Sequence, residues 1–377
     1  MSTAVTATGE KPLTSAALRE LSARSNLPGI VRAVSHYGAI GVFGTLIWLV
    51  SSTYGIAWAL PLISVQGYFV AFLFMVVHET AHKTAFRSRA LNLAFGHLSS
   101  FAIGLPYEYY CLFHWDHHRY TQDPDRDPEL LVGPIPASDT QLAIAYTGLR
   151  QVAFRVGLML RHAFTGDASA PWIPEGKRHI VVKEARLYVA FYVVLLLASL
   201  MLHTTLLLWV WIVPLIVGQL FLRPYLYAEH TGCERTRSAF QNTRTTYTGM
   251  LMRWFAWNMP YHVEHHAYPS IPFHALPKLN RIVDDQIVFR GPGYRAVTRE
   301  TWAWFRRARA DAAGGDQFDQ GGSSIPEIAL VENLRRPRVR DAFGDHRELY
   351  PAELAQQRLR ISRGVASQTF RRRAGGR

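Results

Sequence analysis

Cysteine is scarce in this chain, which limits the kinds of site that it can build. Only Cys111 and Cys233 occur among 377 residues, and neither belongs to a Cys-x-x-Cys pair. A disulfide framework and an iron–sulfur cysteine set are therefore not expected. The first thirty residues also lack the apolar core of a signal peptide, so the first apolar helix is expected to direct membrane insertion itself.

Charged residues are missing from two long stretches. No Lys or Arg lies between Arg32 and Lys83 or between Arg186 and Arg223, and Glu79 is the only acidic residue in these two gaps. Outside the gaps basic residues are frequent, and the formal net charge is +13. A positive charge confined to the flanks of apolar stretches indicates contact with an anionic membrane surface, and no nucleic-acid partner is expected.

The two gaps predict four membrane-spanning helices, since about 17–25 apolar residues cross a bilayer as a helix. The predicted spans are residues 37–53, 57–77, 187–203 and 205–222, of which the third is short. Both turns between paired spans lack Lys and Arg, whereas every other segment carries them. The positive-inside rule then puts both termini and residues 83–186 on the cytoplasmic side.

The expected fold is an all-α membrane protein, with four transmembrane helices and a helical cap on the cytoplasmic side. The expected domains are a cytoplasmic segment at 1–36, a membrane domain at 37–290 and an Arg-rich cytoplasmic tail at 291–377. The tail has seventeen Arg and no Lys, and it is expected to be loosely ordered at the surface. The chain is expected to be a multi-pass protein of the inner, or plasma, membrane.

Histidine carries the strongest pattern in the sequence. Eight of the sixteen histidines fall in three groups, with spacings of three and four residues that share one face of a helix. The groups are His78 and His82; His114, His117 and His118; and His262, His265 and His266. All three lie on the cytoplasmic side of the predicted topology, so they can meet. Eight imidazoles exceed the needs of one ion, whereas two ions with four or five nitrogens each would use them all.

Imidazole binds zinc, copper, iron and nickel, so ligand type alone does not choose the metal. A hydrolytic zinc site needs only three protein ligands. The His78-Glu79-Thr80-Ala81-His82 segment resembles a zinc-peptidase motif, but that interpretation would leave the other imidazoles unused. Two imidazole-bound metals beside hydrocarbon fit iron and dioxygen better, because an unactivated C–H bond needs a strong metal-centred oxidant.

A calcium site is not expected. The acidic run Asp123, Asp125 and Asp127 resembles a calcium loop, but Pro128 and Pro134 stand where that loop needs glycine and a bidentate glutamate.

The three histidine motifs, His78-Glu79-Thr80-Ala81-His82, His114-Trp115-Asp116-His117-His118 and His262-Val263-Glu264-His265-His266, resemble those of the membrane fatty acid desaturase family over roughly residues 37–277. The resemblance implies a non-haem di-iron enzyme that uses dioxygen and two external electrons. Relatives in this family include hydroxylases, ketolases and decarboxylases that form terminal alkenes. A further histidine after the last span is often a ligand in the family, and His230 matches it by position. The implied metal ligands are therefore the eight clustered histidines and His230.

The chain departs from the family at one position. Relatives can carry an Asn four residues before the extra histidine, where it holds a water on one iron, and here that residue is Leu226. Glu229, Asn242 or Asn258 can substitute for it.

Three carboxylates lie inside the histidine motifs. Glu79, Asp116 and Glu264 are expected to accept hydrogen bonds from imidazole N–H groups, which orients the rings and raises their basicity. The remaining histidines lack spacing partners and are expected to be structural.

No His-Pro-Gly-Gly cytochrome b5 signature is present, so electrons are expected from another protein, a ferredoxin, rubredoxin or cytochrome b5, that docks on the Arg-rich surface. The first functional hypothesis is desaturation of a fatty acyl or related lipid chain. Hydroxylation or oxidative decarboxylation by the same irons is the alternative. A non-enzymatic membrane protein that binds or transports metal is a remote third hypothesis, and the lack of other acidic residues in the apolar gaps argues against an ion path.

Overall fold

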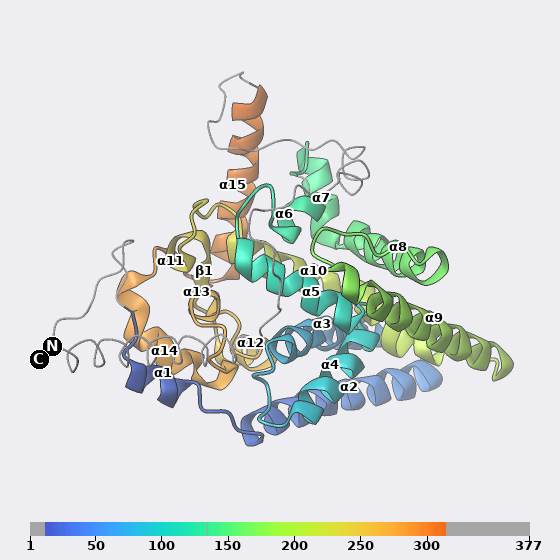
Figure 1. Ribbon diagram of the computed structural model, residues 1–377. Coiled ribbons are helices and arrows are strands. Elements are labelled where there is room, and N and C mark those ends of the chain that lie inside the picture. Colours follow the sequence, from blue (N-terminus) through green and yellow to red (C-terminus); the bar gives the residue numbers. More distant parts are fainter. Residues whose placement is uncertain (1–11, 134, 314–377) are drawn as a thin grey trace, which may run out of the picture. The chain divides into compact units, whose positions relative to one another are not determined.

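The computed structural model describes residues 12–133 and 135–313, and these residues are mostly helical (Figure 1). The longest helices are α2 (Leu27–Tyr54), α3 (Ile56–Ala81), α9 (Arg178–Met201), α10 (Val213–His230) and α15 (Tyr294–Ala313). The shorter ones are α1 (Ser15–Leu21), α4 (Arg89–Ala102), α5 (Tyr107–Tyr120), α6 (Pro128–Val132), α7 (Asp139–Thr147), α8 (Leu149–Thr165), α11 (Ala239–Asn242), α12 (Met250–Phe255), α13 (His262–Ala267) and α14 (Leu276–Val283). The expectation of an α-helical protein is thus confirmed.

Two short strands were not expected from the sequence. Strand β1 (Arg244–Thr246) pairs in parallel with β2 (Phe289–Gly291), and Arg244 lies opposite Phe289. The pair fastens the segment after α14 to the segment that precedes α12. Helices α11 to α14 gather at one end of the long helices, on the left of Figure 1.

Among the described residues, three helices are long and apolar enough to cross a membrane: α2, α3 and the continuous helix Leu208–His230, which joins a π-helical turn to α10. They contain the predicted spans 37–53 and 57–77 and most of 205–222. Gly55 makes the turn between α2 and α3 with a φ of 93°, a backbone conformation that is easy only for glycine.

The fourth predicted span, 187–203, lies mostly in α9. The first half of this helix carries Arg178, Lys183, Glu184 and Arg186, so the uncharged part is confined to residues 187–201. That part is shorter than the roughly 20 residues that usually cross a bilayer.

Helix α3 is the centre of the structure, and it packs against α2, α4, α5 and α10. Its contact with α10 depends on two glycines. A Cβ atom on Gly218 would come within 2.0 Å of the Gly67 carbonyl oxygen, and one on Gly67 would come within 2.7 Å of the Pro214 carbonyl oxygen. Small residues let the two backbones touch, which is a common basis of helix association in membranes.

We expect Gly218→Ala to destabilise the protein by about 1–3 kcal/mol, because the added methyl group meets backbone that cannot move aside. Gly41→Ala is the matched control, since a Cβ atom there meets nothing within 4 Å. Thermal unfolding in detergent should show a lower midpoint for Gly218→Ala and an unchanged or slightly raised midpoint for Gly41→Ala. Equal midpoints for the two variants would show that the α3–α10 contact tolerates the extra carbon.

The start of the Arg-rich tail differs from the expectation of loose order. Residues 294–313 form α15, which packs on α10, and Val297, Thr301 and Phe305 on one face of it are buried. Arg306 lies 2.7 Å from the Asp139 carboxylate, and Arg309 pairs with the same group. The rest of the tail, residues 314–377, lies outside the described residues, as does the first part of the N-terminal segment, residues 1–11.

Candidate metal centre

Four helices bring the candidate ligands to one place. His78 lies in the last turn of α3 and His82 caps its end, whereas α5 carries the second motif and α13 the third. His230 is the last residue of α10. The structure therefore brings together all nine histidines that the sequence singled out. Eight of the nine form two groups by the spacing of their nitrogens, which we call cluster A (His78, His82, His114, His118, His265) and cluster B (His117, His230, His266).

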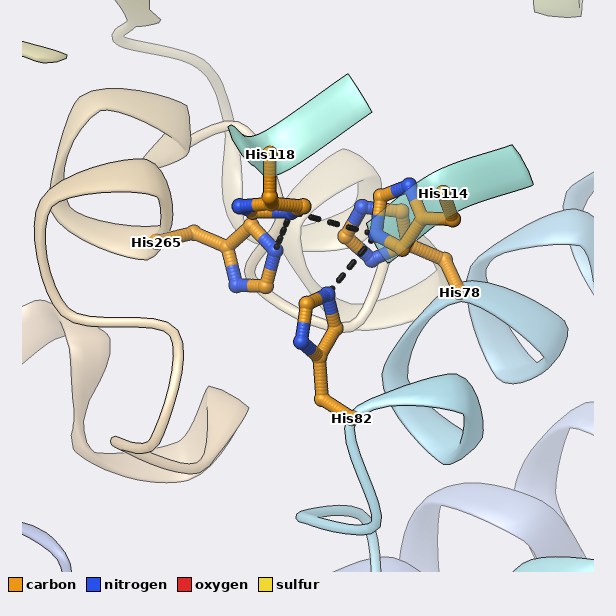
Figure 2. Close-up of side chains that lie close together, drawn as sticks. All are labelled: His78, His82, His114, His118 and His265. Atoms are coloured by element: carbon orange, nitrogen blue, oxygen red, sulfur yellow. Dashed lines mark hydrogen bonds between the residues drawn. The ribbon is translucent and has the colours of Figure 1, made fainter. Parts of the chain in front are cut away.

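Cluster A is the larger group (Figure 2). The Nε2 atom of His114 lies 2.7 Å from that of His82 and 3.2 Å from that of His118. The Nε2 atom of His265 lies 3.1 Å from that of His118. The ring of His78 closes the group, with its centroid 4.3 Å from the His114 ring and 4.6 Å from the His265 ring.

Cluster B lies against cluster A. The Nε2 atoms of His117 and His262 each lie 3.2 Å from that of His230. The nitrogens of His262 lie too far from the other members to belong to either group, but its Nε2 lies beside cluster B next to His230. The His266 ring stacks on the His118 ring at a centroid distance of 4.0 Å, which joins the two clusters.

The imidazoles of cluster A suit a metal ion. Burial lowers the pKa of His82, His114 and His118 well below the usual range and that of His265 to about 3, so these rings are neutral. A neutral imidazole has one N–H and one lone pair, so the nitrogens that face one another cannot all be satisfied by hydrogen bonds. Both ring nitrogens of His78 are buried without a partner among the described residues. A cation that accepts the converging lone pairs would remove this cost.

His117 has the opposite electrostatic environment. Burial disfavours its charged form, but the Glu129 and Asp127 carboxylates outweigh burial and raise its pKa to about 9. Its Nδ1 donates to Asp127 at 2.9 Å, and the backbone N–H groups of Gln122 and Glu129 donate to the same carboxylate. This arrangement keeps a proton on Nδ1 and turns Nε2 toward His230, and a metal bound at Nε2 would displace the second proton that the raised pKa favours. This contact of Asp127 was not predicted from the sequence.

The three carboxylates inside the motifs make other contacts than expected. Glu79 accepts a hydrogen bond from the backbone N–H of Phe273 at 3.0 Å, which fastens the end of α3 to the segment after α13. Asp116 accepts a hydrogen bond from Arg119 at 2.9 Å, at the surface of α5.

Glu264 also fastens backbone segments together. It accepts hydrogen bonds from Thr245 and Asn280, and burial raises its pKa to about 7 although these two bonds oppose the shift. The described hydrogen bonds of Glu79 and Glu264 thus hold the backbone that carries the motifs rather than the rings.

Two of the three candidate substitutes for the missing Asn lie beside the centre. The Oε1 atom of Glu229 is 3.3 Å from Nδ1 of His262, and the backbone oxygen of Asn242 is 3.2 Å from Nδ1 of His230. The side chain of Asn258 instead donates to the carbonyl of Phe273 at 3.0 Å. Leu226, at the family's Asn position, packs against the main hydrophobic core.

Among the described residues, the other histidines belong to neither cluster A nor cluster B; they are His36, His97, His162, His179, His203 and His274. His346 lies outside the described residues. His36 is buried in α2, and its Nε2 lies 2.8 Å from the Phe69 carbonyl oxygen.

Comparison with known proteins agrees with this geometry. Residues 56–298 match the sequence profile of the family described as fatty acid desaturase. The chain belongs to the fatty acid desaturase family. The resemblance seen in the three motifs is thereby confirmed, and with it an oxidoreductase of desaturase type.

Two curated members of this desaturase family are similar to the chain. The dihydrorhizobitoxine desaturase of Bradyrhizobium elkanii is 26% identical over 304 residues, which cover 74% of this chain and 78% of the relative. The sphingolipid delta(4)-desaturase/C4-monooxygenase of Rattus norvegicus is 27% identical over 241 residues, which cover 61% of this chain and 67% of the relative. The desaturase family is known for iron, and clusters A and B offer donors of the kind that iron accepts.

Proposed function

We propose that this protein holds two iron ions in clusters A and B and uses dioxygen and two external electrons to desaturate a fatty acyl or related lipid chain. The proposed ligands are the five histidines of cluster A, the three of cluster B, and His262. The observation that supports the proposal most strongly is the convergence of nine imidazoles at the end of an apolar helix. The irons would supply the oxidising power that removes hydrogen from an alkyl chain.

The residues around the clusters are suited to this reaction. Phe74 lies one turn before His78 on α3, and its ring is 5.4 Å from that of Tyr110, which stacks on His114 at 5.1 Å. The partly buried ring of Phe74 and the buried ring of Tyr110 form a largely apolar wall next to cluster A, which favours an alkyl chain over water. The hydrogen bond to Asp127 fixes the direction in which the ring of His117 points, and the Glu229 carboxylate lies 3.3 Å from Nδ1 of His262.

The proposal includes the membrane arrangement predicted from the sequence. The desaturase-like membrane domain is residues 37–290, with α9 as a fourth, short span and both termini on the cytoplasmic side of the inner, or plasma, membrane. The helices that carry the histidines form the cytoplasmic cap. A ferredoxin, rubredoxin or cytochrome b5 is the proposed electron donor, because a basic surface attracts an acidic protein.

Hydroxylation is the second candidate function. The rat relative is named both desaturase and monooxygenase, which makes hydroxylation a second candidate for this chain. The two reactions share the removal of a first hydrogen and differ in whether a second hydrogen is lost or oxygen is added. Both candidates therefore use the same ligands and differ in their products.

The test is a product assay on the purified, iron-loaded protein with a reducing partner, dioxygen and lipid substrates. We expect mass spectrometry to find a product that has lost two hydrogens. A product that has gained an oxygen atom would select the hydroxylase, and a lack of dioxygen consumption with every lipid class would contradict both.

Removal of the metal should abolish the activity. A strong chelator is expected to eliminate substrate-dependent dioxygen uptake, and ferrous iron is expected to restore it, since no protein side chain in the centre can replace the oxidant. Zinc is the matched control, because it binds imidazole but has no redox chemistry. Full activity in protein shown to be metal-free would exclude the proposed centre.

A further inference from the structure

Helix α8 lies in the part of the sequence that carries no motif, and its outer face is apolar. Apolar residues recur on it at every third or fourth position and share one face. Leu149 is 51% exposed, Val156 40%, Leu160 38% and Phe164 76%. Buried Met159 and Ala163 lie at one edge of this face and pack against Ala185 and Tyr188 of α9. A helix with this arrangement is typical of one that lies in a membrane interface.

Helix α9 continues this surface and changes character along its length. Its outer side carries the exposed apolar residues Leu187, Phe191 and Val194. The change from charged to uncharged residues falls between Arg186 and Leu187. In a bilayer such a change marks the boundary between headgroups and hydrocarbon.

A shallow hollow, largely open to the surface, lies at this boundary on one face of α9. Its lining residues are His179, Val182, Lys183, Arg186, Leu187 and Ala190. The end toward the start of the helix is basic and the other end is apolar, which matches a phosphate group with an acyl chain below it.

The basic groups of the hollow are available to a ligand. Neither Lys183 nor Arg186 forms an ion pair with a carboxylate among the residues that the structure describes. Arg186 is held in place, since its Nε donates to the Ala163 carbonyl at 2.9 Å and leaves the other guanidinium nitrogens free for further bonds. Glu184, the one acidic residue of this stretch, is buried on the inner side of α9.

The inner position of Glu184 is fixed by its hydrogen bonds. It accepts from the backbone N–H groups of Tyr107 and Glu108, each at 2.9 Å. No carboxylate therefore lines the hollow. The same bonds tie α9 to the start of α5, which carries the second histidine motif.

We propose that this hollow binds one anionic phospholipid, with its phosphate on Lys183 and Arg186 and an acyl chain along Leu187 and Ala190. The apolar face of α8 lies in the same leaflet beside it. The lipid sets the depth at which α9, and through it α5, sits in the membrane. The site is separate from clusters A and B. Its test measures lipid binding without turnover, so the result does not depend on metal in either cluster.

The test measures binding of phosphatidylglycerol and phosphatidylcholine with identical chains to the purified full-length protein in mild detergent, by native mass spectrometry. We expect the wild type to prefer phosphatidylglycerol by about tenfold or more, since each basic residue near an anionic headgroup contributes about fivefold. Lys183→Gln/Arg186→Gln should bind the two lipids equally, and Lys183→Gln alone should lose about fivefold. The single variant leaves the bond from Arg186 to α8 intact, so it separates loss of binding from loss of structure.

The matched control is Arg295→Gln/Arg299→Gln, which removes the same charge from exposed positions on α15. It should keep the preference of the wild type. An unchanged preference in Lys183→Gln/Arg186→Gln, or an equal loss in the control, would overturn the proposal. Displacement of the lipid by soluble glycerophosphoglycerol would also overturn it, because that result indicates a simple anion site without a chain groove.

Discussion

Replacing His118 with alanine is expected to lower the iron content of the protein and to reduce turnover by at least about a hundredfold, since even residues behind a ligand cost 10–100-fold. His118 is chosen because it touches both clusters. Its Nε2 lies 3.2 Å from that of His114 and 3.1 Å from that of His265, and its ring stacks on His266. Iron per chain by elemental analysis and product formation by mass spectrometry are the two measurements.

His203→Asn is the control for His118→Ala, because His203 is exposed in the turn after α9 and lies outside both clusters, and asparagine tolerates its positive φ of 48°. It should retain the iron and the turnover of the wild type. Both variants should elute as monodisperse, inserted protein, which separates loss of the site from loss of the fold. Normal iron content and normal turnover in His118→Ala would remove this residue from the ligand set.

Asp127→Asn is expected to lower iron affinity or turnover by about 10–100-fold, because the carboxylate that orients a ligand imidazole is lost. An amide at this position can present its NH₂ group to His117 and thus no longer favours a proton on Nδ1. It also accepts fewer of the three hydrogen bonds that Asp127 receives from His117, Gln122 and Glu129. A titration of metal-free protein with ferrous iron gives the affinity directly.

Asp116→Asn is the matched comparison for Asp127→Asn, because the sequence alone points to Asp116 as the supporting carboxylate. Asp116 bonds to Arg119 at the surface of α5, so its change to Asn should alter iron affinity less than about twofold. A large effect at Asp116 with none at Asp127 would reverse the two assignments.

The spans and the meeting of the histidines followed from local patterns. Apolar length predicted α2, α3 and the helix Leu208–His230, although α2 begins ten residues before the predicted boundary at Tyr37. Helical spacing predicted that each motif presents its rings on one face, and an even number of spans predicted that the motifs share one side. These predictions use only the spacing of residues along one helix and the number of charged residues that flank it.

The features that the sequence did not predict depend on contacts between distant segments. Asp127 lies ten residues after His117 and reaches it only because the chain turns back after α5, where Gln122 adopts a φ of 66°. The spacing of residues along a helix does not predict a contact that forms across such a turn. Helix α15 was not predicted, because its many arginines indicated a loosely ordered surface segment. The helical spacing of the apolar residues Val297 and Phe305 would have indicated a helix with one buried face.

The central claim is that two irons lie in this protein, one in cluster A and one in cluster B. Anomalous scattering at the iron absorption edge, from crystals of the iron-loaded protein, tests it most directly. We predict two iron peaks per chain, one surrounded by the nitrogens of His78, His82, His114, His118 and His265, and the other by those of His117, His230, His262 and His266. A single iron peak per chain, or iron located away from these histidines, would contradict the account.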